Sequence, residues 1–194
     1  PQVLEIGCGN GATLAWLKAN GVAGHTTGIE LAEHMAPAAQ KNVDRLITGN
    51  VEAILEAHAS DVEYDLVLCL DVLEHLVDPW EMMRKIAHVL KPGGRVVCSI
   101  PNVRHFSVLL PLIFKGQWRY EEVGILDRTH LRFFTKTGAA DLMKTGGLRI
   151  TTIKPNIHVG SKSHLARILS LGFLTDFCSV QYLISAQKQT LDVL

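Results

Sequence analysis

The run from Val3 to Gly11 (VLEIGCGNG) constrains what this chain can fold into more than any other stretch. A short apolar segment that contains Glu5 breaks into glycines at positions 7, 9 and 11, and an amphipathic helical pattern begins at Ala12. A buried strand, a tight glycine loop and a helix start, in that order, let a backbone approach a ligand closely. The run therefore predicts the first strand–loop–helix unit of an α/β fold, with a binding site at the loop.

The spacing of the glycines narrows the kind of ligand. A dinucleotide-binding loop reads G-x-G-x-x-G, whereas this one reads G-x-G-x-G and has Glu5 two residues before its first glycine. A carboxylate at that place opposes a pyrophosphate but suits a ligand with a cationic amino group. The pattern resembles the first motif of the class I S-adenosylmethionine (SAM)-dependent methyltransferases. This resemblance assigns to the cofactor site Glu5, Gly7, Cys8, Gly9 and Gly11.

Two later segments extend the resemblance. Glu30 ends a strand expected at His25–Ile29 and stands nineteen residues after Gly11, where an acidic residue meets ribose hydroxyls. The alternative is an exposed acid at a strand end. The run 49–51 follows a strand expected near 44–48, at a place where the methyltransferases that this chain resembles contact the adenine. The resemblance therefore adds to the cofactor site Glu30, Leu31, Asn50 and Val51.

The pentapeptide 71–75 (DVLEH) follows the strongest strand signal of the chain, the apolar run at 64–70. It resembles the segment after strand four of the same enzyme class. The resemblance implies that Asp71, Val72 and His75 hold the methionine end of SAM, and that Glu74 or His75 faces the acceptor, with Glu74 as the substrate-binding candidate. A metal site is the rival interpretation, since Asp71, Glu74 and His75 are possible ligands. The spacing is neither H-E-x-x-H nor H-x-x-E-H, and no second histidine lies nearby in sequence, so we expect no metal.

A helix is expected to begin at 78–79, with proline at its first position. Its residues Trp80, Met83, Ala87 and Leu90 recur at helical spacing, so we expect them to face the core. The run LKPGG at 90–94 stands before a strand expected at 95–100 and is a further mark of the class I methyltransferases.

From 101 to 134 the regular alternation of strands and helices stops. A connection this long in a compact domain is usually functional, and it leaves its strand at the carboxyl end, where open α/β sheets bind ligands. Asp127, Arg128, His130 and Arg132 crowd four ionisable groups into six residues. A solvated charged turn is the plain alternative to the substrate-binding and acid–base segment that we expect. The run DRTHLRFFT looks like one found in bacterial methyltransferases near cell-surface sugar or lipid pathways.

The last part of the chain supplies a helix expected at 135–144, a strand at 148–154 and a final strand at 181–186. An extra helix is expected at 163–171, with Leu165, Ile168, Leu169 and Leu171 apolar. It would serve as a lid, a dimer contact or a membrane-resting face. The membrane interpretation is weak, because few cations accompany those leucines.

These elements predict a doubly wound α/β fold with helices on both faces of a seven-stranded, mostly parallel sheet. The resemblance covers nearly the whole chain and adds the strand order 3-2-1-4-5-7-6, with strand seven antiparallel. We expect a single SAM-dependent methyltransferase domain over 1–194, with a substrate-side insertion at 101–134 and a helical insertion at 156–178. The chain opens at Pro1 and enters its first strand within two residues, so we expect a fragment that lacks its N-terminal segment.

Composition excludes some classes of function. The chain has 19 basic and 19 acidic residues, so no global charge favours nucleic acid or an anionic membrane as a partner. Its four cysteines are widely spaced without a C-x-x-C pair, which favours buried free thiols in a reducing, cytoplasmic compartment. No apolar run reaches the ~18 residues that a membrane span needs.

The predicted reaction is an in-line transfer of a methyl group from SAM to a small-molecule or glycan-type acceptor, favouring an acceptor oxygen. Alignment supplies most of the acceleration, and His130 or His105 is the candidate base. Asn102, Asp127, Arg128 and Arg132 are the candidate acceptor-binding residues beside Glu74, the arginines as a grip for an acidic group. A homodimer is possible. Two rivals remain, an NAD-dependent oxidoreductase and a non-catalytic SAM-binding module of a larger protein.

Overall fold

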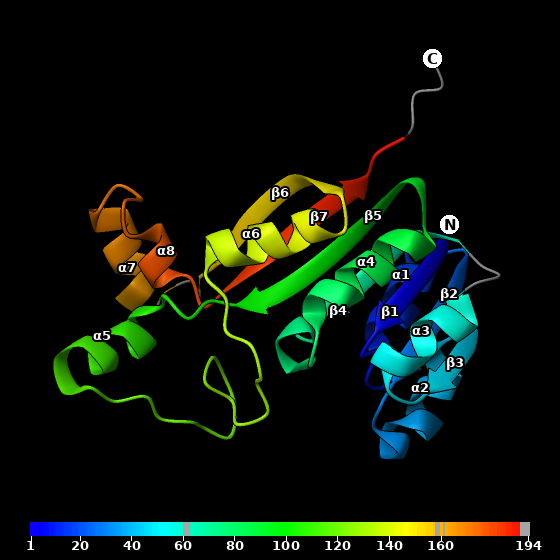
Figure 1. The fold of residues 1–194 in the computed structure, drawn as a ribbon, viewed down its shortest axis with the longest axis horizontal. Coiled ribbons are helices and arrows are strands. Elements are labelled where there is room, and N and C mark those ends of the chain that lie inside the picture. Colours follow the sequence, from blue (N-terminus) through cyan, green and yellow to red (C-terminus); the bar gives the residue numbers. More distant parts are fainter. Residues whose placement is uncertain (60–62, 158–159, 161, 191–194) are drawn as a thin grey trace.

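The computed structural model describes residues 1–59, 63–157, 160 and 162–190, and these residues form one sheet of seven strands (Figure 1). The strands are β1 (Gln2–Ile6), β2 (His25–Glu30), β3 (Arg45–Thr48), β4 (Tyr64–Leu70), β5 (Leu90–Pro101), β6 (Leu148–Asn156) and β7 (Gln181–Lys188). They lie in the order β3-β2-β1-β4-β5-β7-β6. Strand β7 is antiparallel to β5 and β6, and the other neighbours are parallel. The predicted fold class and strand order are confirmed.

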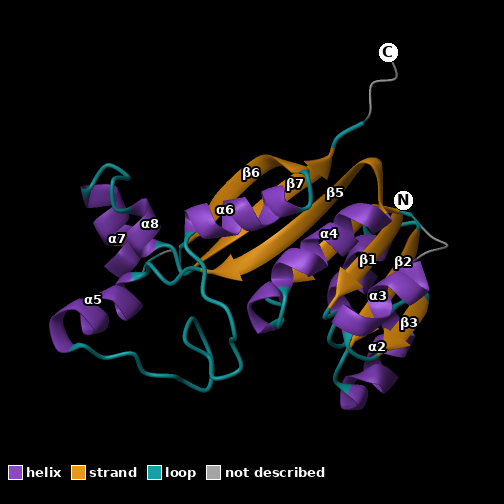
Figure 2. Ribbon diagram, viewed as in Figure 1, coloured by secondary structure: helices purple, strands orange, loops and turns teal. Residues whose placement is uncertain are grey.

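The helices follow the strands in the expected alternation until β5 ends (Figure 2). They are α1 (Ala12–Ala19), α2 (Ala36–Asn42), α3 (Val51–Ala59), α4 (Pro79–Val89), α5 (Phe106–Lys115), α6 (Lys136–Thr145), α7 (Lys162–Leu169) and α8 (Thr175–Cys178), with 3₁₀ turns η1 (Glu33–Met35) and η2 (Leu73–His75). Between β2 and β3 the chain forms η1 and then α2, and Pro37 lies in the first turn of α2, where proline suits a helix start. Helix α8 was not predicted, and residues 158, 159 and 161 of the expected helical insertion lie outside the described residues.

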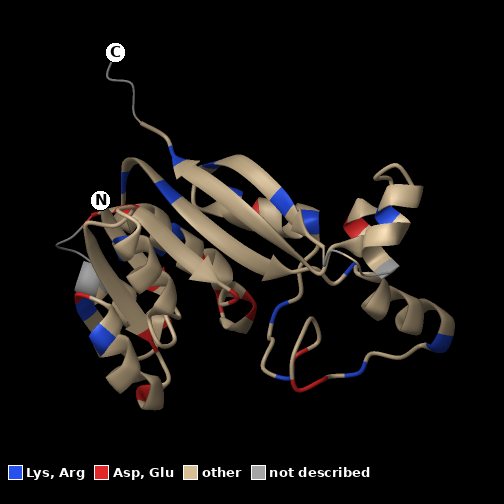
Figure 3. Ribbon diagram, turned by 180° about the vertical axis from the view of Figure 1, so that it is seen from behind, with Lys and Arg blue, Asp and Glu red and all other residues tan. Residues whose placement is uncertain are grey.

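Two apolar cores lie on opposite faces of the sheet. Leu4 and Ile6 of β1 point into the larger core, which packs against α3, α4 and α6. Val3 points to the other face, where α1 and α2 complete a smaller core. These two helices cover the β1–β3 side only, and among the described residues no helix lies on the back of β5, β7 and β6 (Figure 3). That open face is largely polar, with Arg95, Ser185 and Gln187 in the registered rows, as a solvated sheet face requires.

Helix α4 corrects one expectation. Met83, Ala87 and Leu90 are buried, although Leu90 is already the first residue of β5. Trp80 is 41% exposed, because it lies in the first turn of α4, beyond the edge of the core. Its ring instead lies under the Arg132 guanidinium, 5.8 Å from ring centroid to Cζ. Asp78 caps the helix as the amide of Glu81 donates to its carboxylate.

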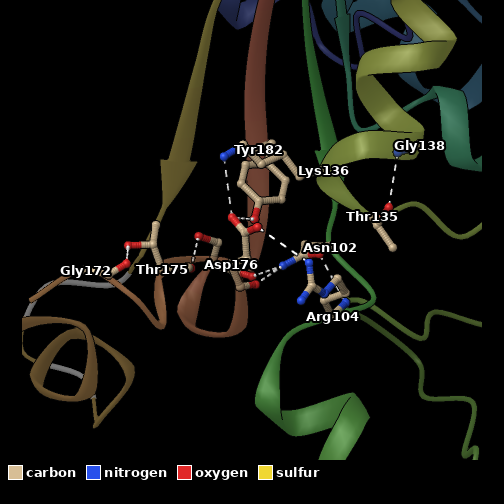
Figure 4. Close-up of polar contacts among 10 residues, drawn as sticks. Asn102, Arg104, Thr135, Lys136, Gly138, Gly172, Thr175, Asp176 and Tyr182 are labelled. Carbon is tan, nitrogen blue, oxygen red and sulfur yellow. Dashed lines mark hydrogen bonds and ion pairs between the residues drawn. The ribbon is translucent and has the colours of Figure 1, made fainter. Parts of the chain in front are cut away.

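Helices α5, α7 and α8 lie together beyond the carboxyl end of β5 (Figure 1). Asp176 of α8 joins them to the sheet (Figure 4). Its carboxylate accepts a hydrogen bond from Tyr182 at 2.9 Å and pairs with Arg104 and Lys136. The ring of Phe177 stacks on Phe106 of α5. Residues of both expected insertions therefore meet at the ligand edge of the sheet.

All four cysteines are buried free thiols, as predicted. In the described part of the chain, no helix has the length and apolar character needed to cross a membrane.

Candidate functional site

The glycine loop after β1 adopts left-handed backbone conformations, which residues with a Cβ rarely adopt. Gly7, Gly9 and Gly11 have φ angles of 70°, 54° and 77°. A Cβ on Gly7 would lie 2.6 Å from Cγ2 of Val72. The amides of Gly7 and Cys8 donate to the Ile29 carbonyl at 2.8 and 3.1 Å, which ties the loop to β2. The loop therefore brings its backbone against the segment that follows β4.

A cavity of about 290 Å³ opens beside this loop. It is lined by Gly7 and by residues that follow β2, β3 and β4, because parallel strands bring their carboxyl ends to one edge. Its lining includes these residues predicted for the cofactor: Glu30, Leu31, Asn50, Val51, Val72 and His75. We call it the donor cavity.

Glu30 organises the wall of the donor cavity. Its carboxylate accepts hydrogen bonds from the amides of Gly9 at 2.7 Å and Ala32 at 2.8 Å, one on each oxygen. Each carboxylate oxygen keeps a second lone pair, so Glu30 can still accept two hydroxyl groups. Asn50 accepts from the Glu52 amide through its side-chain oxygen, which leaves the side-chain NH₂ to donate or turn toward a ligand.

Glu5 is buried beneath the loop, with 3% of its surface exposed. Its Oε2 has no hydrogen-bond partner among the described residues, and burial raises the pKa of Glu5 to about 7. A cation placed beside this carboxylate would satisfy it. Cys8 differs from its neighbours, because its sulfur packs against Gly28 in the smaller core and does not line the donor cavity.

A larger cavity of about 550 Å³ lies next to the donor cavity, and His75 lines both. We call it the acceptor cavity. It brings together residues from η2, from the segments after β5 and α5, and from the start of β7. Its lining includes these residues singled out from the sequence: Asp71, Glu74, His75, His105, Asp127 and His130.

Glu74 and His130 meet inside the acceptor cavity. Their side chains are 1% and 6% exposed, and His130 Nε2 lies 4.0 Å from Glu74 Oε1. Burial raises the pKa of Glu74 to about 8, and neither of its carboxylate oxygens has a hydrogen-bond partner in the described structure. His130 Nδ1 lies 3.0 Å from the carbonyl of Ile125. Since a carbonyl only accepts, Nδ1 carries the proton of the neutral ring and Nε2 presents its lone pair toward Glu74.

His75 completes this group. Its Nδ1 lies 3.2 Å from the Thr129 carbonyl, so that its Nε2 also carries the lone pair when the ring is neutral. The rings of His75 and His130 meet edge to face with centroids 4.7 Å apart. One ligand atom each from Glu74, His75 and His130 lie within 4.8 Å of one another, a geometry that could hold a divalent cation.

The segment 127–132 reaches η2 through its backbone. The amides of Leu131 and Arg132 donate to the carbonyl of Glu74 at 2.8 and 3.0 Å. Asp127 accepts from the amide and hydroxyl of Thr129, at 2.8 and 2.6 Å, which lowers the pKa of its carboxyl. These bonds hold His130 over Glu74.

Three predicted acceptor-binding residues face other partners. Arg128 is exposed and pairs with Glu122 at 2.7 Å. Arg132 donates to the Val77 carbonyl and lies over Trp80, which fastens the segment to α4. Asn102 is fully buried and donates to the carbonyls of Asp176 and Ser179. None of the three lines the acceptor cavity.

His105 lines the acceptor cavity but also has a structural task. It caps α5, with Nδ1 accepting from the Ser107 amide at 3.2 Å, and Nε2 lies 3.3 Å from the Ser163 hydroxyl of α7. The hydrogen-bond partners of His105 are therefore those of a helix-capping residue and not those of a catalytic base.

Val180 and Gln181 line the acceptor cavity and were not predicted. Nothing in their local sequence marks them. They reach the cavity because β7 runs against the other strands and so begins at the edge where those strands end.

Comparisons with known proteins give a family and a shared fold. A family model described as "Methyltransferase domain" matches residues 1–153. The chain is 32% identical over 190 residues to a ubiquinone biosynthesis O-methyltransferase from Hydrogenovibrio crunogenus, covering 96% of this chain and 75% of that protein. A protein of the same name from Aromatoleum aromaticum is 29% identical over 195 residues, covering 96% and 77%.

A solved SAM-dependent methyltransferase from Mesorhizobium loti shares the fold. The TM-score is 0.66 at 16% identity, over 96% of this chain and 90% of that one.

Proposed function

This chain belongs to the methyltransferase domain family and is a SAM-dependent methyltransferase, and we propose that it methylates a ring hydroxyl of a small hydroxyarene. The observation that carries the proposal is the pair Glu74–His130, buried in a cavity that adjoins the donor cavity. The names of the two curated relatives support an acceptor oxygen.

The donor cavity suits SAM on the chemistry of its lining. Among the lining residues, the spare lone pairs of Glu30 fit a ribose diol. Glu5 lies below the glycine loop, outside that lining, and its unpartnered Oε2 fits a cationic amino group. Ile29, Val51 and Leu76 offer apolar walls for a flat ring. When bound, SAM would supply a methyl group whose carbon an oxygen nucleophile can attack, and the sulfur would leave as a neutral thioether.

The chain's own task is to bring the acceptor oxygen into line and to remove its proton. His130 Nε2 is the atom that accepts that proton, because the Ile125 carbonyl holds the other ring proton on Nδ1. Glu74, 4.0 Å away, would stabilise the imidazolium in its ionised form, which its raised pKa places at about pH 8 and above.

A phenolic hydroxyl has a pKa of about 10, within reach of an imidazole base. A glycan hydroxyl is the second acceptor that the sequence suggested, but it holds its proton more tightly, so the same base would act on it less effectively. The proposal therefore favours a hydroxyarene.

The experiment is methyl transfer to catechol, measured as S-adenosylhomocysteine formed by wild type, His130→Gln and Glu74→Gln. We expect kcat to fall about 100-fold or more in His130→Gln, the scale of a lost general base, while the Kd for S-adenosylhomocysteine stays unchanged. His88→Gln, an exposed histidine of α4, is the matched control and should keep wild-type kcat.

Two outcomes would contradict the proposal. Wild type that binds S-adenosylhomocysteine but methylates no hydroxyarene would exclude this acceptor class. Full kcat in His130→Gln would remove His130 as the base.

A further inference from the structure

A further cavity of about 290 Å³ adjoins the acceptor cavity on the side of α5. Ser107 and Glu121 line both cavities, so the two lie against each other at these residues. Val108 and Pro111 of α5 face Leu126 across it. We call it the distal cavity.

The distal cavity contains two cations, Lys115 and Arg119. Neither has an ion pair or hydrogen bond to the side chains or backbone that the structure describes. Their state differs from that of the other cations between 104 and 136: Arg104 and Lys136 pair with Asp176, Arg128 pairs with Glu122, and Arg132 donates to the Val77 carbonyl. Between 104 and 136, the two cations without a described partner, both of them exposed, thus line one and the same cavity.

Acidic and basic side chains occupy different parts of the two adjoining cavities. Glu121 stands where the two cavities join, whereas Lys115 and Arg119 line the distal cavity alone. An acceptor that spans both cavities would pass Glu121 with an uncharged part and end beside the two cations. A guanidinium and an ammonium that line one cavity match a carboxylate or a phosphate group.

We propose that the distal cavity binds an anionic group at the far end of the acceptor, held by Lys115 and Arg119. The inference rests on the proposed function, since the acceptor hydroxyl must lie beside His130 for the molecule to reach both cavities. It replaces the anionic grip first expected from Arg128 and Arg132, whose partners lie within the protein.

The test uses three acceptors that share a catechol head: dihydrocaffeyl alcohol, its phosphate ester, and dihydrocaffeate. Each is measured with wild type and with the double variant Lys115→Gln/Arg119→Gln. Binding to protein saturated with S-adenosylhomocysteine is followed by calorimetry, and turnover with SAM gives KM and kcat. The variant Lys41→Gln/Arg45→Gln removes the same charge from exposed residues of α2 and β3 and serves as the matched control.

We expect wild type to bind at least one of the two anionic acceptors 10-fold or more tightly than the alcohol. The double variant should lose that preference while its kcat, its Kd for the alcohol and its Kd for S-adenosylhomocysteine stay unchanged. Preference for only the carboxylate or only the phosphate would identify the anionic group.

Equal affinity of wild type for all three acceptors would overturn the inference and leave the proposed function intact. The same holds if the preference survives in the double variant or disappears equally in the control. If wild type binds S-adenosylhomocysteine but neither binds nor methylates any catechol, the proposed function fails and the inference fails with it.

Discussion

Glu5 and Glu74 are two buried carboxylates at the ligand edge, and both have a raised pKa because burial disfavours the charged form. They differ in what lies near them. Glu5 lies below the glycine loop with one oxygen unpartnered, while Glu74 faces a histidine across 4.0 Å. The first therefore suits a cation brought by a ligand, and the second suits a proton exchanged with a neighbouring base.

Glu5→Gln should change how stability depends on pH. The folded protein holds a proton on Glu5 up to about pH 7, whereas the ordinary value is 4.5, so unfolding free energy falls as pH rises from about 4.5 to about 7. A neutral glutamine removes this loss. We expect the variant to gain up to about 3 kcal/mol relative to wild type between pH 5 and pH 8 in urea unfolding.

The control for this prediction is Glu33→Gln, an exposed acid of η1, which should show no such gain. The same Glu5 variant should bind S-adenosylhomocysteine more weakly, since the ligand's ammonium loses its carboxylate. Tighter binding than wild type at pH 8 would contradict the role assigned to Glu5.

At the scale of elements, the loop between β1 and α1 depends on glycine for two separate reasons. Gly7 needs both a positive φ of 70° and the absence of a Cβ, because Val72 would lie 2.6 Å away. Gly21 has almost the same φ, 71°, but an added Cβ would meet nothing within 4 Å. The pair separates backbone strain from steric contact.

Gly7→Ala should therefore cost more stability than Gly21→Ala. Both variants carry the cost of a left-handed alanine, about 1–2 kcal/mol, and only Gly7→Ala must also displace Val72 from the donor cavity. We expect at least a 10-fold loss of S-adenosylhomocysteine affinity in Gly7→Ala and none in Gly21→Ala, by calorimetry. Equal affinities would show that the loop tolerates a side chain at position 7.

The Asp176 side chain joins helix α8 to Tyr182 of β7, to Arg104 and to Lys136 of α6 (Figure 4). Asp176→Ala removes the acceptor for the Tyr182 hydroxyl and two ion-pair contacts of 3.6 Å. We expect a loss of about 1–2 kcal/mol in unfolding free energy and faster amide exchange in α8. Asp141→Ala, which breaks the exposed pair with Lys144, should cost under about 0.5 kcal/mol.

The strand order and the donor-side residues followed from the sequence because their signals are local. An apolar run, a glycine loop and an acid at a strand end each mark one element, and parallel strands bring those ends to one edge. The partners of Arg128 and Arg132 could not be predicted from the sequence, because a charged residue near a site does not indicate which neighbouring group it will pair with. Val180 depends on the direction of β7, and that is a property of the whole sheet.

At the scale of the whole molecule, ligand binding and folding are linked. S-adenosylhomocysteine at 100 times its Kd should add about 2.7 kcal/mol to the unfolding free energy. For a chain of this length that shift raises Tm by about 5–10 °C. Thermal unfolding with NAD at the same concentration is the control and should show no shift. An NAD response without an S-adenosylhomocysteine response would contradict the cofactor.

The two cavities draw on different lengths of the chain. The donor cavity is lined by residues 6–77, whereas the acceptor cavity needs residues from 71 to 181. On a ribosome, every residue of the donor wall has been translated once Val77 is added. The acceptor wall is complete only when the first residue of β7, Gln181, has been added. During biosynthesis, all residues that line the cavity for the methyl donor are therefore present about a hundred residues before those that line the cavity for the methyl acceptor.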